Sequence, residues 1–273
     1  MPSPSEKPIG DGFYGDVGGL SAHEEARIRV MRVFKNVDIK ERLDKCGRIR
    51  EDALWNNVID MINSALGDLN DPKPIIIANV RKAIPPGQQF EPCRVKLAVY
   101  FALAMRCLSD KSLGISVIAP YRELIDTARH YYRRLSGITG ISGINVRFLT
   151  VQSMLGGGED DIIISILGKE WNLRSGEQTI YFREPENLNV QFSRHRLMLI
   201  VIGDVIRLRN TAARTAQRMG LSGYSAEDII RIRKTLDVML EFANLSVSSR
   251  EYIRKIPPYI SLGHGAVFRE VSC

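Results

Sequence analysis

The sequence predicts an α/β fold in which a parallel sheet carries helices on both faces, with helical N- and C-terminal extensions. Five short runs of the 273-residue chain are rich in Ile and Val, and segments with helical periodicity separate them. The runs are apolar throughout instead of alternating with polar residues, which is typical of strands covered on both faces. Strand, helix and strand in succession indicate parallel strands joined by right-handed crossovers.

The individual elements follow from these patterns in order. The predicted strands are residues 74–80, 115–119, 146–151, 160–166 and 197–203. Apolar residues recur at helical spacing in 92–108 and 121–135, which predicts helices between the strands. Ligands of such sheets bind at the carboxyl ends of the strands, so the residues just after these strands, or on the helices beside them, are the first candidates for a site.

The pattern divides the chain into three regions. Residues 1–72 are expected to be a mostly helical extension, 73–204 the α/β domain, and 205–273 a helical extension with a tail. Ser225 and Asp228 form a capping-box pattern ahead of an amphipathic segment, so a helix is predicted from Ser225 to about Ala243. The last fifteen residues are expected to form no regular element.

Composition excludes several classes of protein. Apolar residues make up 44% of the chain and charged residues 25%, which argues against disorder, collagen and coiled coil. The net charge of +7 allows nucleic acid as a partner without requiring it. The longest apolar run, Leu97 to Met105, is too short for a bilayer, and the polar start shows no secretory signal. We therefore expect no membrane partner and a cytoplasmic or nuclear location.

The four cysteines are far apart in the sequence and form no CxxC pair. This spacing predicts neither a disulfide framework nor a zinc cage, and it favours a reducing compartment.

Three segments carry candidate chemistry. The first is Ala119-Pro120-Tyr121-Arg122, which ends a predicted strand. The second, TVQSMLGGGEDD at 150–161, is a glycine-rich loop with acidic residues between two strands. The third, LNVQFSRHR at 188–196, precedes the last strand. Each segment alone fits an ordinary turn or helix end.

Together and in this order, the three segments resemble the second RecA-like domain of superfamily 1 helicases, in the branch of the nonsense-mediated-decay helicase. That family carries "TPYR", "TVDSFQGxExD" and "RRLNVALTRAK" blocks in this order, and the resemblance covers roughly residues 73–204. It implies that Arg194 is an arginine finger and that Arg122, Gly156 and Arg194 contact the nucleotide. It also implies that Thr150 and Ser153 contact nucleic acid. Planar guanidinium groups suit phosphate geometry, and hydroxyls are natural donors to phosphate oxygens.

The chain departs from the family pattern at several positions. Gln152, Leu155 and Gly158 stand where the family has Asp, Gln and Glu, and His195-Arg196 replaces Ala-Lys. The sequence contains no GxxxxGK[ST] phosphate loop. The chain alone should therefore not hydrolyse ATP, and ATP with Mg²⁺ is expected only if another RecA-like lobe completes the site.

Two hypotheses remain open. In the first, the chain is the C-terminal motor domain of a superfamily 1 helicase, its partners being RNA or DNA, expected to be single-stranded, and a chain that carries the first RecA-like lobe. In the second, it is a degenerate, non-catalytic interaction module that retains the RecA-like fold. Arg122 and Arg194 favour the first hypothesis, whereas Leu155 and Gly158 favour the second.

Overall fold

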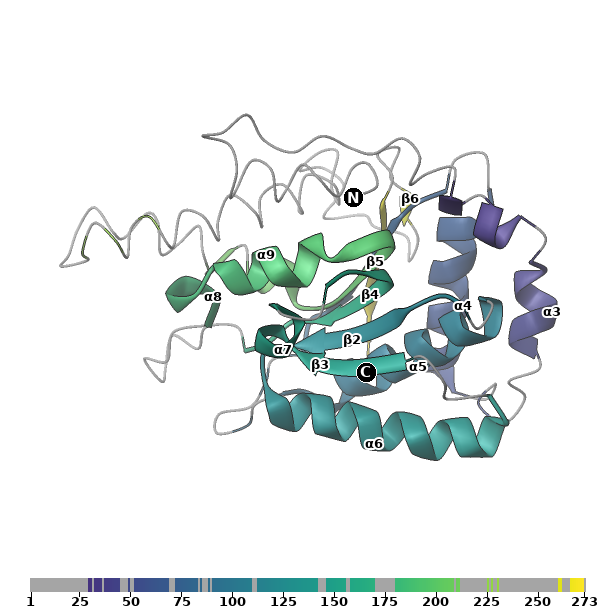
Figure 1. Ribbon diagram of the computed structural model, residues 1–273, viewed down its shortest axis with the longest axis horizontal. Helices are drawn as coiled ribbons and strands as arrows, with labels where there is room; N and C mark the ends of the chain where they lie inside the picture. Colours follow the sequence, from purple (N-terminus) through teal and green to yellow (C-terminus); the bar gives the residue numbers. More distant parts are fainter. Residues whose placement is uncertain are drawn as a thin grey trace.

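The architecture comes from a computed structural model of the chain (Figure 1). The structure describes residues 29–211 except 31, 36, 45–48, 50–51, 69–71, 83, 85–87, 89, 110–111, 142–145, 156–157, 170–179 and 209. It also describes residues 225, 227, 230, 260–261 and 266–272.

Seven strands of the described residues form one sheet in the order β3-β2-β4-β5-β1-β7-β6. All neighbours are parallel except β6, which runs antiparallel to β7. The α/β prediction is confirmed, and all five predicted strands are present with ends shifted by at most two residues. The strands are β1 (Ile75–Val80), β2 (Ile115–Ala119), β3 (Val146–Thr150), β4 (Asp160–Ile166), β5 (His195–Gly203), β6 (Ile260–Ser261) and β7 (Ala266–Val271).

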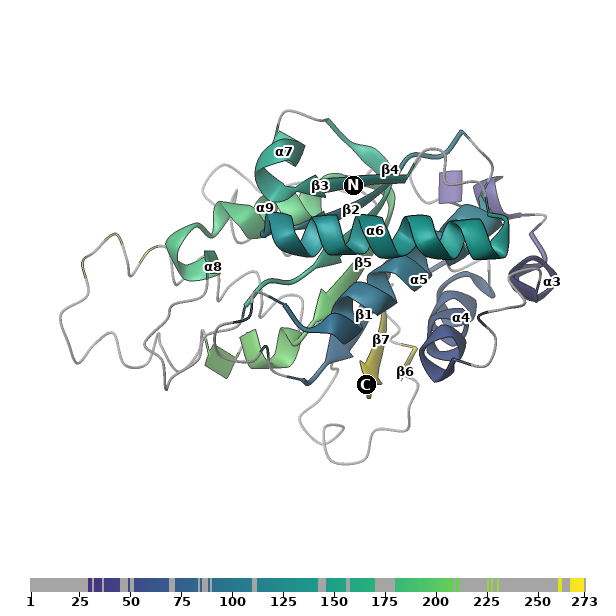
Figure 2. The same cartoon turned by 90° about the horizontal axis from the view of Figure 1, so that it is seen from below.

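Helices cover both faces of the sheet, as predicted (Figures 1 and 2). One face packs against α4 (Ala53–Leu66), α5 (Pro92–Leu108) and α6 (Arg122–Thr139). The other face packs against α7 (Val151–Leu155), α8 (Ile180–Arg183) and α9 (Glu186–Ser193). Alternate residues of β1 show why the run is apolar throughout, because Ile75 and Ile77 belong to one core and Ile76 and Ala78 to the other.

The helix predicted at 121–135 continues to Thr139 as α6. It ends at Gly140, whose φ of 70° is the left-handed conformation that glycine adopts without steric penalty after a helix. The helical spacing of apolar residues predicted an end at residue 135, because the spacing does not extend as far as Gly140.

The N-terminal region contains α3 (Ile39–Asp44) as well as α4. Trp55, Val58 and Met61 of α4 are fully buried in the core that α5 and α6 share. The described part of this region contains α3 and α4, and α4 packs directly on the α/β sheet.

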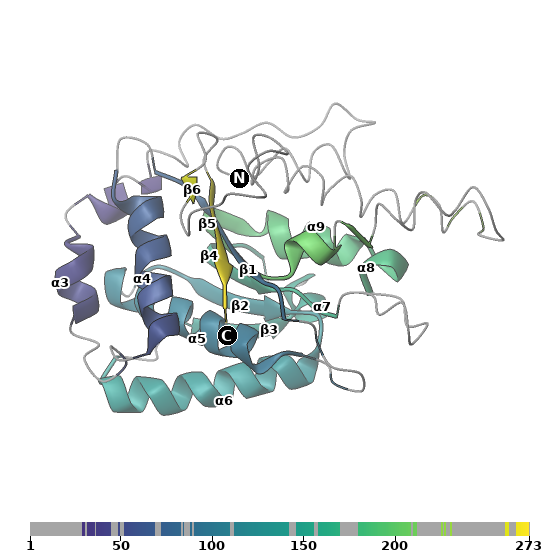
Figure 3. The same ribbon diagram turned by 180° about the vertical axis from the view of Figure 1, so that it is seen from behind.

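The expectation of a tail over the last fifteen residues is wrong. Ala266–Val271 form β7, which pairs in parallel with β1 along its whole length (Figure 3). The strand was missed because Arg269 and Glu270 interrupt its apolar run. In the structure, Arg269 pairs with Asp60 of α4 and Glu270 pairs with Arg81. The helix predicted over 225–243 lies almost wholly outside the described residues.

Two further expectations concern cysteine and membranes. Cys93, in the first turn of α5, is disulfide-bonded. One bonded cysteine is not the framework of several disulfides that the cysteine spacing argues against, so that expectation stays a prediction. Within the described residues, no helix combines the length and the apolar character needed to cross a bilayer.

Candidate functional site

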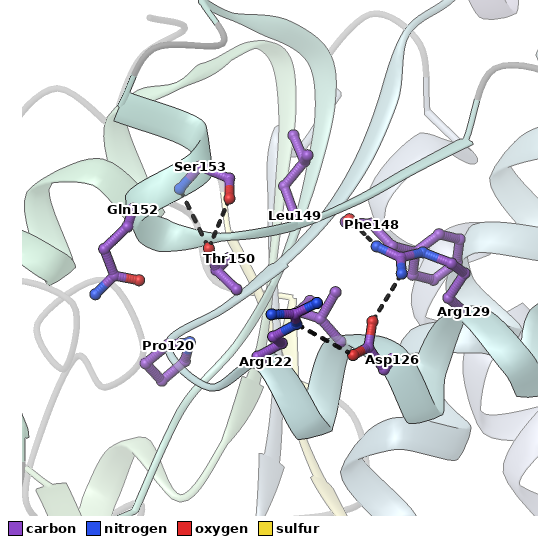
Figure 4. Close-up of a pocket in the computed structure, with 10 residues that line it drawn as sticks. Pro120, Arg122, Asp126, Arg129, Phe148, Leu149, Thr150, Gln152 and Ser153 are labelled. Atoms are coloured by element: carbon purple, nitrogen blue, oxygen red, sulfur yellow. Dashed lines mark hydrogen bonds and ion pairs between the residues drawn. The ribbon is translucent and has the colours of Figure 1, made fainter.

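A cavity of about 530 Å³ lies at the carboxyl ends of β2 and β3 (Figure 4). It brings together three of the five residues that the sequence singled out, namely Arg122, Thr150 and Ser153. They meet because β2 and β3 are neighbours and Ala119 pairs with Thr150, so both strands deliver their following residues to the same edge. The full lining is Pro120, Arg122, Ile125, Asp126, Arg129, Phe148, Leu149, Thr150, Gln152 and Ser153.

The charged groups of the cavity come from one face of α6. Arg122, Asp126 and Arg129 stand four and three residues apart, which places them one above another on the helix. Arg129 is held by Asp126 at 2.7 Å and by the carbonyl of Phe148, to which it donates at 2.8 Å. Among the described residues, Arg122 has a single 3.6 Å contact, between its Nε and Asp126, and its side chain is 89% exposed. Two arginines and one aspartate leave the lining with a formal charge of +1.

The hydroxyl groups of the cavity come from the junction of β3 and α7. The Oγ atoms of Thr150 and Ser153 lie 2.9 Å apart, and the N–H of Ser153 donates to Thr150 Oγ1 at 3.2 Å. Val151 and Met154 fasten the short helix to the core. The two hydroxyls therefore face the cavity from a fixed backbone, opposite Arg122 in Figure 4.

The turn that carries Arg122 is held by close packing. The Cα of Gly168, just after β4, lies so near Pro120 that a methyl group there would come within 2.6 Å of the proline ring. Arg94 is fully buried on α5 and donates to the carbonyls of Leu167 and Gly168, which fixes the same loop from the other side.

Arg194 lies at the amino ends of the strands (the amino edge), opposite the carboxyl ends that border the cavity. It directly precedes β5, and its carbonyl accepts a hydrogen bond from the N–H of Asp160 at the start of β4. The register places His195 beside Asp160 and Val201 beside Ser165, which pairs with Ile118. At about 3.3 Å per residue, Arg194 is roughly 20 Å from the end of β2 along the strands. The expectation that Arg122 and Arg194 face one cleft is therefore wrong, because parallel strands send them to different edges.

The amino edge around Arg194 is rich in ion pairs. Asp160 accepts from Arg147 at 2.7 Å and from Ser116, and Asp161 pairs with Arg29 at 3.2 Å. These contacts make the predicted acidic pair a structural feature of this edge. Within the described residues, no group of three or more His, Cys, Asp or Glu side chains could hold a metal ion.

Arg194 itself is partly buried. Its Nε is buried and has no hydrogen-bond partner in the part of the chain that the structure describes. His195 is fully buried beside it, and burial lowers the pKa of its imidazole to about 3. The imidazole is therefore neutral near pH 7 and adds no charge to this edge.

Gly156 lies outside the described residues, and its predicted nucleotide contact stays a prediction. Two charged residues of the cavity, Asp126 and Arg129, were not predicted from the sequence as site residues. Their spacing from Arg122 on a helix was the available signal, because i, i+4 and i+7 share a face.

Comparison with known proteins adds no family. No protein-family model matches the chain, and no curated protein matches it.

Proposed function

We propose that the chain is a helicase-like motor domain whose cavity at the carboxyl edge of β2 and β3 binds the phosphate backbone of single-stranded RNA or DNA. The observation that carries the proposal is the convergence of Arg122, Thr150 and Ser153 on one cavity from two separate sequence blocks. A guanidinium group and two hydroxyls together match the donors that phosphate oxygens accept. Because the Arg122 side chain is 89% exposed, its Nη atoms face solvent and are accessible to a ligand.

The opposite edge has a different role in this proposal. Arg194 supplies an arginine finger to ATP and Mg²⁺ held by a first RecA-like lobe, which a partner chain provides. In this proposal Arg122 contacts nucleic acid and Arg194 contacts the nucleotide, which is compatible with their positions at opposite ends of the strands. This changes the role of Arg122 that the family resemblance implies.

The test is binding of labelled single-stranded RNA and DNA by fluorescence anisotropy across a salt series. Replacing Arg122 by Ala removes one phosphate contact, so affinity should fall roughly tenfold, as expected for a charge-assisted contact of about 1.5 kcal/mol. The slope of log K against log salt should become shallower by about 0.7.

Arg196→Ala is the matched control. Arg196 is also an exposed arginine in an ion pair, with Glu159 at 3.3 Å, but it lies at the amino edge. The variant should bind like the wild type. Equal losses in Arg122→Ala and Arg196→Ala would show only an effect of net charge and would overturn the site.

The second candidate is the non-catalytic interaction module. It is favoured by Leu155, which is 59% exposed at the position where the resembled family has a polar Gln. This candidate gains support if the wild-type chain shows no salt-dependent binding to either nucleic acid.

A further inference from the structure

Leu155 is an exposed apolar side chain on an anchored helix. It is 59% exposed, more than Ile138 or Ile230, the other large exposed apolar residues of the described part of the chain. The neighbouring Met154 is completely buried, so α7 is held against the core while Leu155 points outward. A single exposed leucine is common on protein surfaces, so its meaning depends on what lies beside it.

The cavity lies beside it. Gln152 and Ser153 of α7 line the cavity, and Leu155 follows Gln152 by three residues. Residues three apart on a helix share a side, separated by about 4.5 Å along the axis. An apolar side chain therefore stands on the same short helix as Gln152 and Ser153 of the cavity lining.

We propose that Leu155 contacts a nucleobase of the single strand whose phosphate occupies the cavity. The inference rests on the proposed function and deepens it. A ligand that contacts both the cavity and Leu155 must present an anionic group and, a short distance away, a flat apolar group. Single-stranded nucleic acid does so at every nucleotide, and contact with the face of a base tolerates any sequence. The apolar area that the base and Leu155 bury together favours binding.

The experiment compares two labelled DNA oligonucleotides of equal length, one with bases and one abasic, in the same buffer. Leu155→Ala should weaken binding of the base-containing strand about fivefold, because apolar area is lost. It should leave the abasic strand unchanged relative to the wild type. Leu155→Phe, with a larger flat side chain, should tighten binding of the base-containing strand only. Arg122→Ala should weaken both strands equally.

Ile138→Ala is the matched control, because Ile138 is 43% exposed on α6 and does not line the cavity. It should change neither affinity. An unchanged affinity of Leu155→Ala for both strands, or an equal loss on both, overturns the base contact. In that case a loss in Arg122→Ala still supports the proposed function. If Arg122→Ala is also without effect, or the wild type binds neither strand, the proposed function fails with it.

Discussion

The arginine side chains that the structure describes differ in what their guanidinium groups contact, and Arg94, Arg106 and Arg122 show the two extremes. Arg94 and Arg106 are buried and donate to backbone carbonyls at loop and helix ends. Such groups stabilise the fold, because a buried charge requires hydrogen-bond partners. Arg122 is almost fully exposed and has one long contact to an exposed carboxylate. An exposed pair of this kind contributes little to stability, which leaves Arg122 available for binding.

Asp52 is a second residue whose contacts can be tested. It precedes α4 and accepts from the N–H of Leu54 at 2.9 Å, from Tyr100 at 2.8 Å, and from Lys96. Burial alone would raise the pKa of Asp52, but the hydrogen bonds from Lys96, Tyr100 and Leu54 hold its pKa below the ordinary value of 3.8. A lowered pKa in the folded state means that the carboxylate stabilises the fold above the unfolded pKa. This contribution is lost as pH falls through the folded pKa.

We expect Asp52→Ala to lower the free energy of unfolding by about 1 kcal/mol near neutral pH, as loss of an N-cap does. Asp52→Asn should lose less, because asparagine also caps helices. Urea unfolding at neutral and acidic pH measures both. The stability difference between wild type and Asp52→Asn should shrink on acidification below the ordinary pKa. A difference that is constant with pH would contradict the assignment, and Glu123→Gln on exposed α6 serves as control.

At the scale of elements, the site depends on how the loops after β2 and β4 pack. Gly168 after β4 touches Pro120 and Tyr121 after β2, so these two loops hold each other in place. The loop after β4 is in turn held by the first turn of α5, because Arg94 donates to the carbonyls of Leu167 and Gly168. The position of Arg122 is therefore set by an element that is distant in sequence.

Gly168→Ala tests this packing. The added methyl group would lie 2.6 Å from Pro120 Cγ and 3.0 Å from the ring of Tyr121, both rigid groups. We expect the free energy of unfolding to fall by about 1–3 kcal/mol, typical of overpacking. Denaturant midpoints measure it, with Gly137→Ala as the control. A methyl group at Gly137 meets nothing within 4 Å, and alanine should stabilise that helix position. Equal midpoints for wild type and Gly168→Ala would refute the contact.

At the scale of the whole molecule, C-terminal residues extend the sheet and an N-terminal helix covers it. β7 covers one side of β1, and α4 lies across both (Figure 3). Phe268 and Ala266 enter one core, whereas Val267 and Val271 enter the other. The central strand β1 would be an exposed edge without β7.

Ending the chain at residue 265 should therefore destabilise the protein severely. The loss of four buried apolar side chains and of the β1 pairing should lower stability by more than about 3 kcal/mol and promote aggregation through the exposed edge. Circular dichroism melts and size-exclusion chromatography measure the effect. A chain that lacks only Ser272 and Cys273 is the control. A truncated chain with an unchanged melting temperature would show that β7 is dispensable.

The local sequence by itself determined the α/β class, the five central strands and the two helices between them. Two-sided burial demands apolar residues at every strand position, and this demand is visible without knowing the neighbours. Arg122, Thr150 and Ser153 were indicated by the resemblance of three short blocks to a helicase family, and the carboxyl ends of parallel strands are where such residues can gather.

Tertiary structure alone decided the rest. β7 is a strand because it pairs with β1, and its two charges pair with Asp60 and Arg81; all these partners lie far away in the chain. The separation of Arg122 from Arg194 was missed because the motifs were compared by residue order, although the predicted strands already placed one residue after a strand and the other before one. Arg122 follows a strand and Arg194 precedes one, and in a parallel sheet that difference alone sets them a strand length apart.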